Sequence, residues 1–386
     1  MHDDIEAFQI SIPEHILIDL KSRLANTRWP DQIPGTGWTY GADAAYIREL
    51  CDYWQSSYDW RKHEKALNRF PQFKTGIDDH AIHFIHARSR HENATPLLIS
   101  HGWPGSVVEF MKIIEPLTDP LSHGGQAGDA FHVICPSLPG YGFSDTTRCI
   151  GMDTHAMAGI FARLMERLGY ENYIAQGGDW GALITSNIGV IDAGHVMGIH
   201  LNMPLGIAAK GGDDEVLSDR EKADLADMAY FNTEETGYQR IQGTKPQTLG
   251  VGLNDSPAGL AAWITEKFYT WTDCNGNIES VISKDELLTN IMVYWATQSI
   301  TASTRLYYET TKNPRLRFME EKVAVPTGVA RFPKEIMRFP RKWVERVYTR
   351  VVHWTDFDRG GHFAAMEQPE KLVADIRSFA QKIKGL

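Results

Sequence analysis

The sequence has no excess of basic residues and few cysteines. Its 386 residues include 39 Lys and Arg against 49 Asp and Glu, a formal net charge of −10. Nucleic acid is therefore not an expected partner, because its phosphates require a basic face. The four cysteines are Cys51, Cys135, Cys149 and Cys274. Their wide spacing predicts neither a metal-binding pair nor a disulfide framework, and it indicates a reducing compartment.

Long hydrophobic runs are also missing. No apolar stretch approaches the roughly 18 residues of a membrane span, and the first residues, MHDDIEAFQI, have neither the basic nor the apolar region of a leader peptide. We therefore expect a soluble, cytoplasmic protein without a membrane anchor. A P-loop and a G-x-G-x-x-G pattern are both absent, so we expect no nucleotide cofactor.

Three histidines at a regular spacing raise the question of a metal site. His80, His83 and His86 would converge as ligands on a helix. The surrounding sequence, GIDDHAIHFIHAR, instead predicts a hairpin strand. On a strand, His80 and His86 would share one face about 20 Å apart while His83 points to the other face. We expect no metal there.

Apolar runs typical of strands alternate with helical segments from about residue 90. Strands are expected within 96–105, 131–144, 173–177, 196–204, 323–333 and 350–363, and helices within 107–117, 154–170 and 369–383. This alternation predicts an α/β protein with a mostly parallel sheet. About 115 residues separate the strand expected within 196–204 from the strand expected within 323–333. They are rich in aromatics and helical in pattern, so we expect a helical cap inserted into the sheet domain.

These patterns divide the chain into four parts. Residues 1–89, whose end predicts a hairpin, form an N-terminal extension that joins the sheet edge. Residues 90–204 and 321–386 are the two halves of the α/β core, and 205–320 are the helical cap.

The segment AQGGDWGALI (175–184) predicts a strand, a tight turn and a helix with Asp179 at the turn. Such an elbow strains its central residue and requires small residues two positions before and after it, as Gly177 and Gly181 provide. No G-x-S-x-G occurs in the chain, so a serine nucleophile is not available. Asp179 is either a carboxylate nucleophile or an acidic cap of the following helix.

Two backbone N–H groups are expected beside Asp179. The His101-Gly102-Trp103-Pro104 loop follows a predicted strand, at the position that supplies one oxyanion-hole N–H in α/β-hydrolases. The residue after the nucleophile supplies the other. We therefore assign the hole to the backbones of Trp103 and Trp180, with a plain proline turn as the alternative.

A histidine late in the chain and an acid before it would complete a triad. His362 lies in the glycine-rich RGGHF loop, whereas His353 lies within a predicted strand and is expected to be packed. The acid should follow the preceding strand, where Glu335 stands in RFPKE.

Other polar residues near these segments rank lower as the orienting acid. They are Asp356 and Asp358 on the histidine's own loop, Glu345 in a predicted helix, and Asn202 after an earlier strand.

An aspartate nucleophile suits a saturated electrophilic carbon. A carboxylate is ionised at neutral pH and needs no base to activate it. It would attack an epoxide or alkyl halide to give an ester on the enzyme. Water activated by a histidine would then hydrolyse this ester at the aspartate carbonyl, which is why an oxyanion hole is required.

With HGWPGS, SLPGYGFS, GGDWG and RGGHF in this order, the sequence resembles the epoxide hydrolases of the α/β-hydrolase fold, in particular their microsomal-type branch. The likeness covers nearly the whole chain, including RWPDQIPGTGWTYG in the N-terminal extension. It implies Asp179 as nucleophile, His362 as base and Glu335 as acid. The microsomal relatives carry a membrane anchor, which we do not expect here.

The resemblance also implies two cap tyrosines that hydrogen-bond the epoxide oxygen. The matching positions are Tyr238 and Tyr307, with Tyr308 as the neighbour that a shifted register would select. Tyrosines suit an epoxide because its oxygen stays attached and must be protonated, whereas a dehalogenase would cradle a halide.

A haloalkane dehalogenase using the same ester, and a non-catalytic binding protein on the same scaffold, remain alternatives. The expected substrate is a small apolar or aryl epoxide, suggested by aromatic residues of the cap, and a homodimer stays open. These aromatic residues are Trp263, Phe268, Tyr269, Trp271 and Trp295.

Overall fold

One twisted sheet organises the molecule. The structure, a computed structural model, describes residues 4–209, 216–313 and 321–385. Within these residues nine strands form a sheet in the order β1-β2-β3-β5-β4-β6-β7-β8-β9. The strands are β1 (Glu6–Phe8), β2 (Gln72–Ile77), β3 (His80–Ala87), β4 (Thr95–Ser100), β5 (Phe131–Pro136), β6 (Tyr173–Gly177), β7 (Val196–Leu201), β8 (Thr327–Arg331) and β9 (Val351–Asp356).

The first three strands are antiparallel and the others are parallel. β1 pairs with β2, β2 with β3, and β3 with β5, all antiparallel. From β5 to β9 each neighbouring pair is parallel. The carboxyl ends of the parallel strands therefore share one edge of the sheet, which is where ligands bind in such folds.

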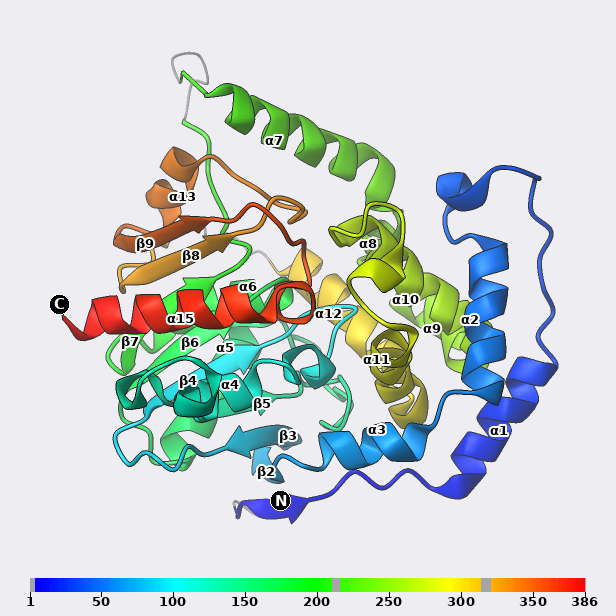
Figure 1. Cartoon of the computed structure of the whole chain (residues 1–386), viewed down its shortest axis with the longest axis horizontal. Coiled ribbons are helices and arrows are strands. Elements are labelled where there is room, and N and C mark those ends of the chain that lie inside the picture. Colours follow the sequence, from blue (N-terminus) through cyan, green and yellow to red (C-terminus); the bar gives the residue numbers. More distant parts are fainter. Residues whose placement is uncertain (1–3, 210–215, 314–320, 386) are drawn as a thin grey trace.

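Helices cover both faces of the sheet (Figure 1). On one face α5 (Thr154–Arg167) and α6 (Trp180–Ile191) pack together, and on the other α15 (Pro369–Lys384) crosses β7, β8 and β9. The short core helices are η2 (Val107–Phe110), α4 (Ile114–Thr118), η3 (Pro120–His123), η4 (Ala127–Asp129), α13 (Arg341–Val347) and α14 (Ala364–Glu367).

A second group of helices lies between β7 and β8 in the chain. It comprises α7 (Asp219–Tyr230), a π-helical turn η5 (Phe231–Glu235), α8 (Gly237–Gln242), α9 (Pro246–Asp255), α10 (Pro257–Trp271), η6 (Ile278–Ser280), α11 (Lys284–Thr297) and α12 (Ile300–Lys312). We refer to these helices as the cap. They lie beside the carboxyl ends of the strands (Figure 1).

The N-terminal segment joins the sheet edge to the cap. Its elements before β2 are β1, α1 (Glu14–Ala25), η1 (Gly37–Tyr40), α2 (Ala44–Ser56) and α3 (Trp60–Leu67). Trp38 stacks on Tyr269 of α10 at 4.0 Å between ring centroids. The Tyr53 hydroxyl donates a hydrogen bond of 2.8 Å to Asp285 of α11. This segment therefore extends the sheet edge, as expected, and it also packs against the cap. The sequence patterns did not predict the contact with the cap.

Local sequence explains where several elements begin and turn. Asp153 caps α5 by accepting hydrogen bonds from the His155 and Ala156 backbones, as acidic residues do at helix starts. The hairpin predicted around residues 72–87 is confirmed as β2 and β3. Asp78 and Asp79 form its turn with φ of 48° and 63°, a conformation that suits a two-residue hairpin loop.

Two expected elements differ from the sequence prediction. The helix expected over 107–117 is split into η2 and α4, with residues 111–113 forming a turn between them. The strand expected over 323–333 is regular only over Thr327–Arg331, and Val323 forms an isolated bridge with Tyr348. Pro326 lies just before β8, and its missing N–H shortens the ladder there.

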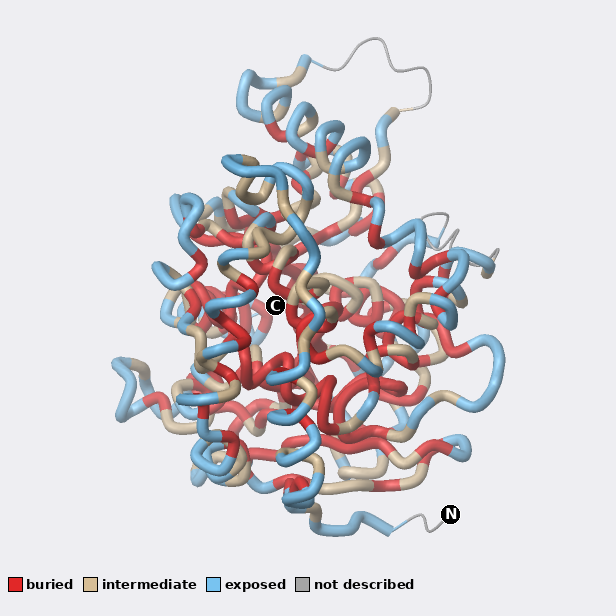
Figure 2. Tube along the Cα trace, turned by 90° about the vertical axis from the view of Figure 1, so that its right-hand side faces the viewer, coloured by how far each residue is buried: buried red, intermediate tan, exposed pale blue. Residues whose placement is uncertain are grey.

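Burial follows this architecture (Figure 2). Buried residues concentrate in the sheet and in the helices that face it, in two apolar clusters, one with α5 and α6 and one with α4 and α15. α7 is mostly exposed, and its buried residues are Asp224 and Met228. In the described part of the chain, no helix has the length and apolar character needed to cross a membrane.

Candidate active site

The elbow places Asp179 at the carboxyl end of β6, immediately before α6. Its φ of 51° and ψ of −131° are a strained combination for a residue with a side chain. A Cβ on Gly177 would overlap the Gly181 carbonyl, and a Cβ on Gly181 would overlap the Ser100 carbonyl of β4. The predicted need for glycine at both positions is therefore confirmed.

The loop after β4 approaches Asp179 from the side. The Trp103 backbone N–H donates a hydrogen bond of 2.8 Å to Asp179 Oδ1. A Cβ on Gly102 would collide with the same oxygen, so glycine at this position gives the carboxylate its room. Trp180 begins α6, and N–H groups in a first helical turn have no intrahelical acceptor. One of the two expected N–H donors thus already contacts Asp179.

The loop after β9 carries His362 over the elbow. Nε2 of His362 lies 3.2 Å from Asp179 Oδ2, and Nδ1 donates a hydrogen bond of 2.6 Å to Glu335 Oε1. The loop is held because the His362 N–H bonds the Trp271 carbonyl at 2.9 Å. A Cβ on Gly361 would lie only 2.5 Å from that carbonyl oxygen. The structure therefore brings together the three residues predicted as a triad.

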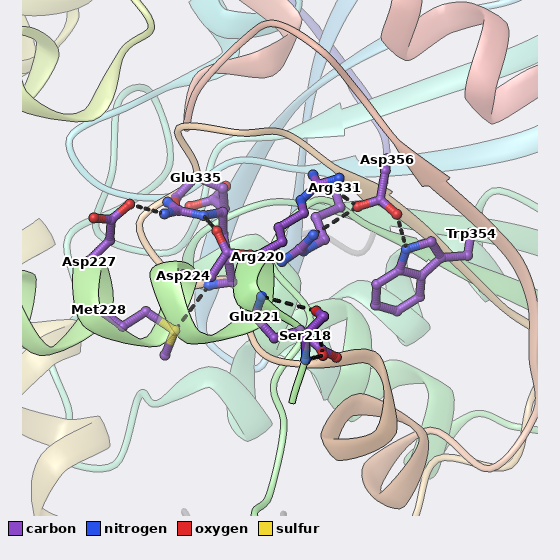
Figure 3. Close-up of polar contacts among 11 residues, drawn as sticks. Ser218, Arg220, Glu221, Asp224, Asp227, Met228, Arg331, Glu335, Trp354 and Asp356 are labelled. Atoms are coloured by element: carbon purple, nitrogen blue, oxygen red, sulfur yellow. Dashed lines mark hydrogen bonds and ion pairs between the residues drawn. The ribbon is translucent and has the colours of Figure 1, made fainter. Parts of the chain in front are cut away.

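The acid sits on a loop that is tied to the cap. Glu335 follows β8 and is almost fully buried. Arg338 donates to the Glu335 carbonyl and, at 2.7 Å, to Asp224 of α7. Arg331 also pairs with Asp224, and at 2.8 Å with Asp356. Figure 3 shows Asp224 among Arg331, Glu335 and Asp227, and the contacts of Asp224 with both arginines link α7 to the loop bearing the acid.

The charges around His362 favour its protonated form. Burial lowers the pKa of the imidazole, but the Glu335 charge and the hydrogen bonds to Asp179 and Glu335 raise it well above its usual value. His362 lies between the carboxyl groups of Asp179 and Glu335, which favour an imidazolium there. Removing the negative charge of Asp179 would remove part of what holds this proton.

Two tyrosines from the cap face Asp179 across a group of aromatic rings. Tyr238 of α8 stacks on Trp103 at 5.2 Å, and Tyr307 of α12 meets Trp180 edge-on at 4.7 Å between centroids. The two tyrosine rings are 5.8 Å apart. Burial is the largest cause and the Asp179 charge adds to it, so both pKa values are raised well above 10. Both hydroxyls are therefore protonated donors.

Comparison with known proteins gives a consistent family. Residues 5–110 match the model described as epoxide hydrolase N terminus, and residues 95–240 match that of the alpha/beta hydrolase fold. A Stigmatella aurantiaca protein named as an epoxide hydrolase is 47% identical over 99% of this chain and 86% of its own length. Epoxide hydrolase 1 of Sus scrofa is 41% identical, over 98% of this chain and 88% of its own.

The chain belongs to the epoxide hydrolase family. The crystal structure of juvenile hormone epoxide hydrolase from Bombyx mori matches with a TM-score of 0.93 and 35% identity, covering 100% of this chain and 96% of that chain. The Aspergillus niger epoxide hydrolase matches with a TM-score of 0.89 and 32% identity, covering 98% and 97%. The expected α/β-hydrolase fold is thereby confirmed.

In this epoxide hydrolase the lower-ranked candidates have other partners or lie at the surface. His353 lies in β9 and bonds Asp375 at 2.8 Å, in keeping with the expectation that it is packed. Asn202 borders the site but accepts a hydrogen bond from Gln176. Tyr308, the register alternative to Tyr307, lies at the surface with 36% exposure.

The remaining acids are accounted for elsewhere. Asp356 pairs with Arg331, Asp358 with Lys371 and Glu345 with Arg341.

The aromatic residues expected to line the substrate site have divided roles. Trp271 lies 5.0 Å from the His362 ring and 5.3 Å from Tyr238. Phe268 stacks on Phe363, while Tyr269 stacks on Trp38, as described above.

Two further members of that group also have structural partners. Trp263 donates a hydrogen bond to Gln242, and Trp295 lies under Arg23. Much of the aromatic content of the epoxide hydrolase cap therefore packs the cap against the N-terminal segment and the loop after β9 rather than facing Asp179.

The three regularly spaced histidines have separate partners. His80 contacts the Asp78 carbonyl, His83 contacts Ser137 and Gln72, and His86 contacts Tyr170. Among the described residues, no group of three or more His, Cys, Asp or Glu side chains is arranged to hold a metal ion.

Sequence reasoning missed two acids of the site. Glu367 accepts hydrogen bonds from the backbones of Gly361, Phe363 and Asp273, and so holds the His362 loop. Glu109 lines the cavity next to Asp179. Glu335 is predicted from its place directly after a strand. Glu109 and Glu367 lie in short helices instead, so this signal does not indicate them.

Proposed function

We propose that this protein hydrolyses an epoxide to a vicinal diol through an ester on Asp179. The observation that carries the proposal is the position of the two Asp179 oxygens. Oδ1 accepts the Trp103 N–H, while Oδ2 lies 3.2 Å from His362 Nε2 and has no backbone donor among the described residues. This arrangement supports Oδ1 as the carbonyl oxygen of the ester and Oδ2 as the oxygen that bonds to the epoxide carbon.

In the first step Asp179 Oδ2 attacks an epoxide carbon and the ring C–O bond breaks. The oxygen that leaves this carbon stays attached to the neighbouring one and takes a proton from Tyr238 or Tyr307. Both hydroxyls are buried donors on the cap side of Asp179. The products of this step are an alkyl ester and a tyrosinate, which balances the proton.

The ester then changes the charge balance at His362. An ester carries no charge, so the attraction and hydrogen bond from Asp179 that raise the pKa of His362 are lost. The imidazolium then releases its proton, which restores the tyrosine, and Nε2 becomes a general base. Glu335 keeps Nδ1 protonated and the ring oriented.

In the second step water adds to the ester carbonyl. His362 removes a proton from this water, and the oxyanion forms on Oδ1 beside the Trp103 and Trp180 backbones. The intermediate collapses by breaking the bond between the Asp179 carboxyl carbon and Oδ2, so this oxygen leaves with the alkyl group. It takes a proton from His362 to complete the diol. The proton left on the Asp179 carboxyl group then returns to His362, and one carboxylate oxygen of Asp179 now comes from water.

A single-turnover experiment in H₂¹⁸O tests this mechanism. With enzyme in excess over styrene oxide, we expect the diol of the first turnover to be unlabelled and the peptide containing Asp179 to gain one ¹⁸O. Label in the diol instead would indicate direct attack by water and overturn the ester route. Asp179→Ala should reduce kcat by about 10⁴-fold or more, because the nucleophile is lost.

His362→Gln separates the two steps. This variant should still form the ester, but it should accumulate an adduct visible by intact mass, because the base for hydrolysis is missing. Its failure to form any adduct with a reactive epoxide would count against the proposal.

The aromatic surroundings support a small apolar or aryl epoxide as substrate. Trp103, Trp180 and Trp271 surround the tyrosines, and aromatic rings favour apolar ligands. The two tyrosine donors favour an epoxide over a haloalkane, since a departing halide needs no proton. Halide release on incubation with 1-bromobutane would support the dehalogenase alternative instead.

A further inference from the structure

A small cavity lies next to the Asp179 carboxylate. Its volume is about 20 Å³, and its lining includes Glu109, Gly105, Asp179 and His362. This is room for about one water molecule, and a polar lining with several partners is what an ordered water requires. Over the residues that the structure describes, neither cap tyrosine lines the cavity. It is therefore separate from the place where the tyrosines would hold an epoxide.

Glu109 points into this region because a glycine makes room for it. A Cβ on Gly105 would overlap the Glu109 Oε1 atom. The carboxyl group of Glu109, from helix η2, thus occupies the space that a side chain at position 105 would take. Apart from the nucleophile Asp179, it is the acid that borders the cavity among the described residues.

Glu109 also borders a groove on the outer side. This groove has a volume of about 110 Å³ and is lined by Val108, Met111 and Lys112, among others. Glu109 is shared by the inner cavity and the groove. Glu109 therefore lies between the inner cavity and a groove whose lining also includes Glu286 and Thr289 of the cap helix α11.

The charge state of Glu109 fits a role beside a developing oxyanion. Burial raises its pKa to about 8, with His362 acting to lower it and Asp179 to raise it. The group is therefore mostly a neutral acid at pH 7. A neutral carboxyl can accept a hydrogen bond through its carbonyl oxygen without repelling the negative charge that forms on Asp179.

We propose that Glu109 binds the water that hydrolyses the Asp179 ester, opposite His362. The water gives one proton to His362 Nε2 and donates its other O–H to the Glu109 carboxyl group. Its oxygen is then aimed at the Asp179 carbonyl carbon, and the ester C–O bond breaks as in the second step above. This assignment rests on the proposed ester mechanism and makes Glu109 a catalytic residue of the hydrolytic step alone.

The test compares Glu109→Met and Glu109→Gln in the full chain with styrene oxide. Met has a similar length but no acceptor oxygen, whereas Gln keeps a neutral acceptor. Stopped-flow tryptophan fluorescence and quenched intact mass would follow ester formation and decay separately. We expect Glu109→Met to form the ester within about 3-fold of the wild-type rate, and to hydrolyse it about 10- to 100-fold more slowly, the loss of one hydrogen bond to a reacting water.

Glu109→Gln should restore hydrolysis to within about 3-fold of wild type, because one neutral acceptor replaces another. Glu115→Gln, an exposed acid in α4, is the matched control and should leave both steps unchanged. Wild-type ester decay in Glu109→Met overturns the assignment. Equal slowing of ester formation and ester hydrolysis in Glu109→Met also overturns the assignment. So does a Glu109→Gln variant that hydrolyses the ester as slowly as Glu109→Met.

The proposed function is tested independently of Glu109. Wild-type protein that forms a labelled Asp179 ester while Glu109→Met hydrolyses it normally would refute the role of Glu109 and leave the ester mechanism standing. Absence of any ester in wild type and in His362→Gln would instead refute the mechanism itself.

Discussion

Single atoms decide the geometry around Asp179. The requirement for Gly177 and Gly181 follows from the elbow pattern alone, and it could be predicted from the sequence. The requirement for Gly102 could not, because the clash involves a side chain 77 positions away in the chain. Local spacing reveals contacts within a turn, whereas contacts between loops depend on how the strands are ordered.

Gly102→Ala should therefore inactivate the enzyme with a limited effect on folding. The added methyl group would push the Asp179 carboxylate away from the Trp103 N–H, and a 1 Å misplacement of a catalytic group can cost about 100-fold in rate. We expect kcat with styrene oxide to fall about 100-fold or more.

Gly194→Ala is the matched control, since a Cβ there meets no atom within 4 Å. It should keep wild-type activity. Normal activity in Gly102→Ala would contradict the tight fit between the two loops.

The glutamates illustrate what a sequence pattern can and cannot reveal. Glu335 was found because the acid of such a triad follows a strand, and the structure brings it to 2.6 Å from His362. Glu109 and Glu367 act through loops and short helices that have no periodic signal. Their positions depend on tertiary packing, which a single sequence does not encode at a fixed spacing.

At the scale of elements, α15 is fastened to the sheet by one acid. Asp375 of α15 accepts hydrogen bonds from His200 of β7, at 2.8 Å, and from His353 and Thr355 of β9. Burial raises the pKa of Asp375, but these hydrogen bonds outweigh it and hold the pKa below 3.8. The carboxylate therefore stabilises the fold at pH values above its unfolded pKa, and this contribution is lost as the pH falls toward its folded pKa.

Asp375→Asn should lower stability most at neutral pH. We expect the loss to be about 2 kcal/mol at pH 7, typical of losing hydrogen bonds to a buried charge. It should shrink below pH 4, where the carboxyl group of the unfolded wild type takes up a proton before that of the folded protein does. Urea unfolding at pH 7, 5 and 3.5 would measure it. A difference of the same size at every pH would mean that the ionised form is not what stabilises α15.

The elements themselves were largely predictable where apolar periodicity was strong. The parallel strands and the long helices α5 and α15 lie within the expected segments to within one residue at an end, and α10 and α11 lie in the part of the chain expected to be a helical cap. The split of residues 107–118 into η2 and α4 was not predictable, since the apolar spacing runs on through it.

At the scale of the whole molecule, the cap is joined to the acid loop through Asp224. This residue sits between Arg331 and Arg338, and all three are buried. Removing it would leave two buried guanidinium groups with fewer partners, a change that typically costs about 3–5 kcal/mol. The same loss would free α7 from the loop that carries Glu335.

Asp224→Ala should therefore lower the melting temperature by several degrees and reduce kcat by a larger factor than KM changes. Asp227→Ala is the matched control, because Asp227 pairs with Arg338 but its side chain is 66% exposed. Exposed ion pairs contribute less than about 1 kcal/mol, so its melting temperature should stay near that of wild type. Equal shifts in the two variants would show that burial of Asp224 is not the cause.

The contact between the N-terminal segment and the cap has a consequence for protein engineering. Trp38 contacts α10 and Tyr53 contacts α11. The family model for this segment extends to residue 110, past the loop after β4 that contacts Asp179. A cap exchanged with one from a hydrolase lacking the segment would leave an aromatic face without its partner. In a chimeric hydrolase, the cap and the first 110 residues should accordingly be exchanged together.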